Sequence, residues 1–263
     1  MNRSVFLILI ALMGVSMRAF AASDLIEQAD SAYTDDDFAT AAALYTQAIS
    51  EQGPSAKLYY NLGNSYYRAG KPGNAILSYE RALRLDPTDE DIRYNLDFVN
   101  SRIVDRPGER GTFLGNLLDT LALSARSNTW AWLAFGCFVL TAAALLAYLF
   151  GQGVLLRKIG FFGGLLTLLG TFFFMFFAFR SASISTSRQY AVVTSASTIL
   201  STVPRTPSDR SQEAMLLHEG TKVEVLDSVA SRQTGDSIAS RWYDVQVDNA
   251  HRAWINASDV ERI

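Results

Sequence analysis

The residue types that most often carry out chemistry in proteins are scarce in this sequence. The chain of 263 residues has two histidines, His218 and His251, and one cysteine, Cys137. Each histidine stands alone, without metal-ligand spacing, and one cysteine can form no intramolecular disulfide. We find no Ser-His-Asp set, no paired-cysteine site and no glycine-rich phosphate loop. We therefore expect a binding protein rather than an enzyme, with no catalytic residues, no metal and no cofactor.

A recurring tripeptide carries the clearest binding signal. Tyr60-Asn61-Leu62 returns 34 residues later as Tyr94-Asn95-Leu96. Small residues in such a repeat let two helices approach closely, while tyrosines fill the remaining space. The same offset of 34 aligns Ala29 with Gly63, Ala41 with Ala75, Tyr45 with Tyr79 and Ala48 with Ala82.

Residues 22–106 resemble about two and a half tetratricopeptide repeats, whose period is 34 residues. Residues 56–89 match the repeat best, and residues 90–106 supply only a first helix, which caps the stack. The resemblance implies a concave face, built by the first helix of each repeat, that binds peptides or proteins. For Tyr60 and Tyr94, packing between repeats is an equal alternative. The residues placed on this face are Tyr60, Asn61, Asn64, Tyr67, Tyr94, Asn95 and Phe98.

Charge narrows the class of partner. The chain carries a formal net charge of −3 and no strongly basic segment, so we expect no nucleic-acid partner. Residues 22–110 contain 15 acidic and 9 basic side chains, a balance of −6. This balance mildly favours a partner with a neutral or basic surface.

Two uncharged apolar segments, residues 130–150 and 159–179, are each long enough to span a bilayer. A buried core helix is the alternative, but such a helix would normally carry a polar face. Residues 151–158 form the connecting loop and include Arg157 and Lys158. Because basic loops stay in the cytoplasm, the sequence predicts a membrane hairpin whose two outer ends lie on the opposite side.

The first 21 residues agree with this orientation. They contain Arg3, a short apolar run and the triplet Ala19-Phe20-Ala21, which is typical of a cleaved signal peptide. A retained N-terminal anchor is the alternative. We expect the segment that follows to be exported, so that the N- and C-terminal parts lie in the periplasm. Residues 112–126 have apolar side chains at helical spacing and predict an amphipathic helix on the membrane surface or, alternatively, against the repeats.

The C-terminal residues 190–263 contain short alternating segments that predict strands at 191–194, 197–203, 221–226, 242–247 and 252–255. The run from Leu217 to Val225 resembles the motif of bacterial SH3-like domains, which implies a small all-β barrel. Trp242, Tyr243 and Trp254 are the candidate binding residues of this domain, although core packing is the more common role of such aromatics.

The order of leader, repeats, membrane hairpin and SH3-like domain resembles the BatE-type proteins of the Bacteroides-aerotolerance group. The resemblance implies a scaffold in a bacterial inner-membrane complex linked to oxygen and stress tolerance. It also implies partners with von Willebrand A domains and, indirectly, a MoxR-type ATPase. The alternative function is a cell-wall sensor whose SH3-like domain binds peptidoglycan.

Overall fold

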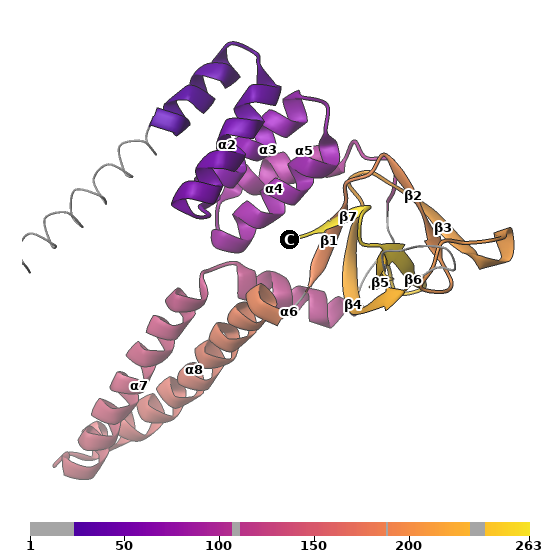
Figure 1. Cartoon of the computed structure of the whole chain (residues 1–263). Coiled ribbons are helices and arrows are strands. Elements are labelled where there is room, and N and C mark those ends of the chain that lie inside the picture. Colours follow the sequence, from indigo (N-terminus) through magenta and orange to yellow (C-terminus); the bar gives the residue numbers. More distant parts are fainter. Residues whose placement is uncertain (1–23, 107–110, 188, 232–239) are drawn as a thin grey trace, which may run out of the picture. The chain divides into compact units, whose positions relative to one another are not determined.

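The computed structural model describes residues 24–106, 111–187, 189–231 and 240–263. The predicted leader, residues 1–21, lies outside the described residues. The chain divides into two compact units. The first unit holds the helical repeats and the C-terminal strands, and the second holds residues 86–88 and the helices of residues 110–188. Figure 1 shows the elements of both units.

The N-terminal part consists of antiparallel helices that follow one another closely. A helix over residues 24–34 pairs with α2 (Phe38–Gln52), and α3 (Ala56–Arg68) pairs with α4 (Pro72–Leu85). A fifth helix, α5 (Glu90–Asn100), ends the series. The predicted unpaired third copy is therefore one helix, which covers the preceding pair.

Local sequence explains where these helices begin. Asp37 caps α2 by accepting a hydrogen bond from the Thr40 amide at 3.2 Å, and Asp36 adopts a left-handed conformation with φ of 61°. The three consecutive residues Asp35, Asp36 and Asp37 thus form a turn that caps α2. Pro72 starts α4 at the position where its missing amide hydrogen costs nothing. The turn before α4 accordingly ends at residue 71.

Close approach between α3 and α4 depends on Gly63. A β-carbon at Gly63 would lie 2.6 Å from Cε1 of Tyr79, so no larger residue fits without a shift. The Tyr79 side chain is 2% exposed and lies in the buried cluster of the second repeat. Gly63 and Tyr79 therefore fix the spacing of the two helices.

The C-terminal strands form one antiparallel sheet with the order β3-β2-β6-β5-β4-β1-β7. Its apolar core includes Leu200, Val223, Val245 and Ile255. Two strands, β3 and β7, were absent from the five predicted ones. The strands are β1 (Tyr190–Val193), β2 (Ser197–Ser201), β3 (Glu213–His218), β4 (Lys222–Ser231), β5 (Ser240–Gln246), β6 (Arg252–Asn256) and β7 (Val260–Arg262).

Repeats and sheet share a core within the first unit. Val192 of β1 belongs to the same buried cluster as Ile76 of α4 and Ile92 of α5. The turn between β3 and β4 also packs against the repeats. Gly220 in this turn lies so close to them that a β-carbon there would be 2.7 Å from Ile103 and 2.9 Å from Ile76. The sequence predicts the repeats and the sheet as separate domains, whereas in the structure they form one compact unit.

Asp105, just beyond α5, makes the polar part of the same contact. Its carboxylate accepts hydrogen bonds from the His218 amide at 2.5 Å, from His218 Nδ1 at 2.8 Å and from Thr221 Oγ1 at 2.7 Å. Burial pushes the pKa of Asp105 upward, but these bonds outweigh burial and hold the pKa below its usual range. A carboxylate that stays ionised thus ties the segment after α5 to the β3–β4 turn.

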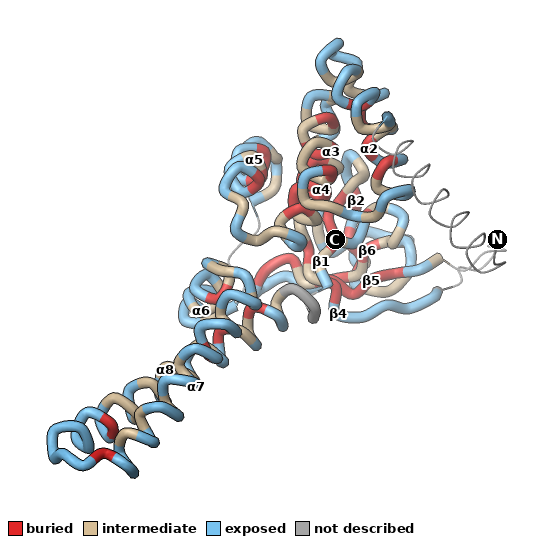
Figure 2. Tube along the Cα trace, turned by 90° about the vertical axis from the view of Figure 1, so that its left-hand side faces the viewer, coloured by how far each residue is buried: buried red, intermediate tan, exposed pale blue. Residues whose placement is uncertain are grey.

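The second unit contains α6 (Phe113–Leu123), α7 (Ser127–Phe150) and α8 (Val154–Ser187). Both α7 and α8 are long and apolar enough to cross a membrane, and Figure 2 shows them exposed along most of their length. Because α8 starts at Val154, only residues 151–153 of the predicted loop are non-helical.

Small and polar side chains bring α7 and α8 together. A β-carbon on Gly160 would lie 2.7 Å from the carbonyl oxygen of Ala144, so the backbones nearly touch there. Elsewhere along the same pair, the Thr141 hydroxyl donates to the Thr167 hydroxyl at 2.8 Å. Helix α6 joins them through an ion pair of 2.8 Å between Asp119 and Arg180.

Candidate functional site

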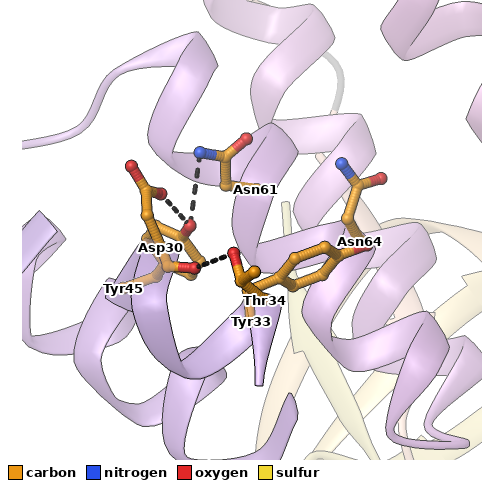
Figure 3. Close-up of a pocket in the computed structure, with 6 residues that line it drawn as sticks. All are labelled: Asp30, Tyr33, Thr34, Tyr45, Asn61 and Asn64. Carbon is orange, nitrogen blue, oxygen red and sulfur yellow. Dashed lines mark hydrogen bonds between the residues drawn. The ribbon is translucent and has the colours of Figure 1, made fainter. Parts of the chain in front are cut away.

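Two small cavities lie side by side on the helical repeats and share Tyr33 and Asn64. The first has a volume of about 240 Å³ and the second of about 130 Å³. We call the two together the groove. The first cavity, shown in Figure 3, is lined by Asp30, Tyr33, Thr34, Tyr45, Asn61 and Asn64. The second is lined by Tyr33, Asn64, Tyr67, Arg68, Tyr79, Asn95, Phe98 and Val99.

The same hydrogen bond is built twice along the groove. The Tyr79 hydroxyl donates to Asn64 Oδ1 at 2.6 Å, and the Tyr45 hydroxyl makes the equivalent short bond to the Asp30 carboxylate (Figure 3). Each tyrosine comes from the second helix of a repeat, and each acceptor comes from the first. The repeat period therefore places a tyrosine hydroxyl and a polar acceptor at matching places in both cavities.

In each cavity, an asparagine from the next helix along the chain adds a hydrogen bond. The Asn61 Nδ2 donates to the Tyr45 hydroxyl at 3.5 Å. The Asn95 Nδ2 donates to Asn64 Oδ1 at 3.0 Å and to the Tyr60 hydroxyl at 3.1 Å. Because these bonds hold the amides in place, the groove presents fixed polar groups beside aromatic rings.

Burial raises the pKa of both central tyrosines. For Tyr45 burial is the largest cause, and the hydrogen bond to the Asp30 carboxylate adds to it. For Tyr79 burial is again the main cause. Both hydroxyls thus remain protonated hydrogen-bond donors over the range of pH in which proteins function.

Five of the seven residues predicted for the concave face line the groove, and two do not line either cavity. Tyr67 and Phe98 form one wall, where their rings meet edge to face at 5.6 Å. Tyr60 lies at the margin and accepts the hydrogen bond from Asn95. Tyr94 is 71% exposed on α5. The five groove residues are Asn61, Asn64, Tyr67, Asn95 and Phe98.

Sequence reasoning missed the contribution of the first helix. Asp30, Tyr33 and Thr34 lie in the helix over residues 24–34 and complete the larger cavity. An offset of 34 maps Asp30 onto Asn64 and Tyr33 onto Tyr67. Applying the repeat period backwards would therefore have found them.

Two of the three candidate residues of the sheet are buried. Trp242 is 3% exposed and Tyr243 is 9% exposed, with Tyr243 inside the sheet core. The Trp242 indole donates to Ser240 at 3.0 Å. Trp254 is half-buried on β6, opposite Asp244 of β5. Burial of the first two side chains agrees with packing as their main role.

Comparison with known proteins identifies the helical part. Residues 26–90 match the family model of the tetratricopeptide repeat. A segment of 72 residues is 40% identical to the protein SGT1 homolog of Oryza sativa subsp. japonica, which covers 27% of this chain and 20% of that protein. The chain therefore spans about a fifth of the length of this relative. Together with the paired helices and the offset of 34, these matches establish that residues 26–90 are tetratricopeptide repeats.

Proposed function

We propose that this protein is a membrane-anchored scaffold whose groove holds a partner protein. The observation that carries the proposal is the groove itself, where fixed amides and tyrosine hydroxyls stand beside the Tyr67 and Phe98 rings. Aromatic anchors beside satisfied polar groups are the usual composition of a protein-binding hot spot. In this proposal the protein acts by binding and is not an enzyme.

The setting that we propose is a Bat-type complex of the bacterial inner membrane, linked to oxygen and stress tolerance. Its support is the order of the segments: predicted leader, repeats, paired apolar helices and C-terminal sheet. Partners with von Willebrand A domains, and indirectly a MoxR-type ATPase, belong to the same proposal. An SH3-like barrel for the sheet is likewise part of this resemblance.

The orientation follows from charge, with Arg157 and Lys158 on the cytoplasmic side and the first unit in the periplasm. The test uses a C137A background and single cysteines at Gln152 or Ser228. In cells with a permeabilised outer membrane, a membrane-impermeant maleimide is expected to label S228C at once and Q152C only after lysis. The reverse pattern would contradict the proposed orientation.

Partner binding is assigned to the groove rather than to a peptidoglycan site on the sheet. The reason is burial of two of the three candidate aromatics, since Trp242 and Tyr243 are at most 9% exposed whereas Phe98 is 37% exposed. A peptidoglycan sensor would need accessible aromatic rings for stacking on sugars.

The function is tested by capture of partners with the full-length, tagged chain from membranes in mild detergent. We expect the double variant Y67A/F98A to lose its specific partners by at least 10-fold, because truncation of each hot-spot ring costs about 1–2 kcal/mol. The matched control is L216A, which truncates a side chain of β3 that is 49% exposed. Equal recovery by Y67A/F98A and L216A would refute the role of the groove.

A further inference from the structure

The two cavities of the groove are built alike but differ in charge. Tyr45 and Tyr79 occupy equivalent places, and each donates its hydroxyl to a residue 15 positions earlier. In the smaller cavity that acceptor is the neutral amide of Asn64, whereas in the larger cavity it is the carboxylate of Asp30. The difference places one negative charge at one end of the groove.

No lysine or arginine of the described residues forms an ion pair with Asp30. Arg68, the cation that lines the neighbouring cavity, is held by Asp36 at 3.1 Å and lies over the Phe38 ring at 4.3 Å. The hydrogen bond from Tyr45 uses one carboxylate oxygen of Asp30. The second oxygen can therefore accept a bond from a ligand.

The walls of the larger cavity suit a cationic side chain. Tyr33 supplies a half-buried aromatic ring next to the carboxylate, and a cation is attracted to such a ring as well as to the charge. The volume of about 240 Å³ lies below the range of about 300–1,000 Å³ typical of small-molecule sites, but it accommodates one side chain.

We propose that the groove binds an extended partner segment whose lysine or arginine side chain enters the larger cavity and pairs with Asp30. An apolar side chain of the same segment lies in the smaller cavity against Tyr67 and Phe98. This inference rests on the proposed function and adds the class of partner. Charge complementarity with the acidic repeat segment, residues 22–110, points to the same class.

The test uses full-length protein in detergent and a library of random octapeptides with both termini capped. Wild-type protein is expected to enrich peptides with Lys or Arg at one fixed position relative to an apolar residue. D30N should abolish this preference and weaken the best peptide about 2-fold to 5-fold, the value of an ion pair with an exposed carboxylate. Asn64 already accepts the same tyrosine bond, so asparagine at position 30 is expected to leave the fold intact.

Two further variants keep the outcomes distinct. N64D adds a charge at the position that both cavities share and should strengthen the basic preference. E51Q removes an exposed carboxylate at the end of α2 and should change nothing. Peptides that depend on Tyr67 and Phe98 but show no basic preference would overturn this inference and leave the proposed function intact. Peptide binding that Y67A/F98A leaves unchanged would instead overturn the proposed function.

Discussion

Tyr79→Ala is expected to lower the free energy of unfolding of the repeat segment by about 3–5 kcal/mol, the usual loss for a large buried ring. The side chain is 2% exposed, lies against Gly63 and donates its hydroxyl to Asn64. Since a whole domain has only about 5–15 kcal/mol of stability, this variant should leave α3 and α4 partly unfolded.

Hydrogen exchange of the full-length chain, followed by mass spectrometry, measures this loss locally. Amides of α3 and α4 should exchange roughly 100-fold to 4,000-fold faster in Y79A, since each 1.4 kcal/mol changes the rate tenfold. Tyr79→Phe is the matched control, because it keeps the ring and removes only one hydrogen bond, worth about 1 kcal/mol. If Y79A and Y79F exchange alike, the ring does not hold the two helices together.

Gly220→Ala is expected to destabilise the contact between repeats and sheet by about 2–5 kcal/mol. Gly220 has φ of 92°, which costs a residue with a side chain about 1–2 kcal/mol. The added methyl group also meets Ile103 and Ile76, and such overpacking costs about 1–3 kcal/mol. Faster exchange should therefore appear in α4 and in β1, on both sides of the contact.

Gly70→Ala separates the two causes. Gly70 has a similar φ of 74°, but a β-carbon there meets no atom within 4 Å. G70A should therefore show the cost of backbone strain alone and leave β1 protected. If G220A leaves β1 as well protected as G70A does, the packing of Gly220 against Ile76 and Ile103 does not hold repeats and sheet together.

The features that the sequence predicts well are local and periodic. The offset of 34 aligns the tyrosines and small residues that form each helix pair, and the two uncharged segments coincide with most of α7 and α8. Five groove residues follow from the same period. These features need only spacing and residue type.

The features that the sequence does not predict depend on distant partners. Nothing next to Gly220 indicates that Ile76 and Ile103 surround it, and nothing near Asp105 indicates its bonds to His218 and Thr221. Strand β3 has little alternation and forms by pairing with β2. Contacts across more than a hundred residues are decided by packing, which local patterns do not encode.

The central claim is that the groove holds a partner protein, and the dissociation constant of the captured partner tests it most directly. Binding is measured with purified full-length protein as wild type, Y67A/F98A and L216A, after circular dichroism confirms equal helix content. We predict a dissociation constant at least 10-fold higher for Y67A/F98A and within twofold of wild type for L216A. Equal dissociation constants for the three proteins would contradict the claim.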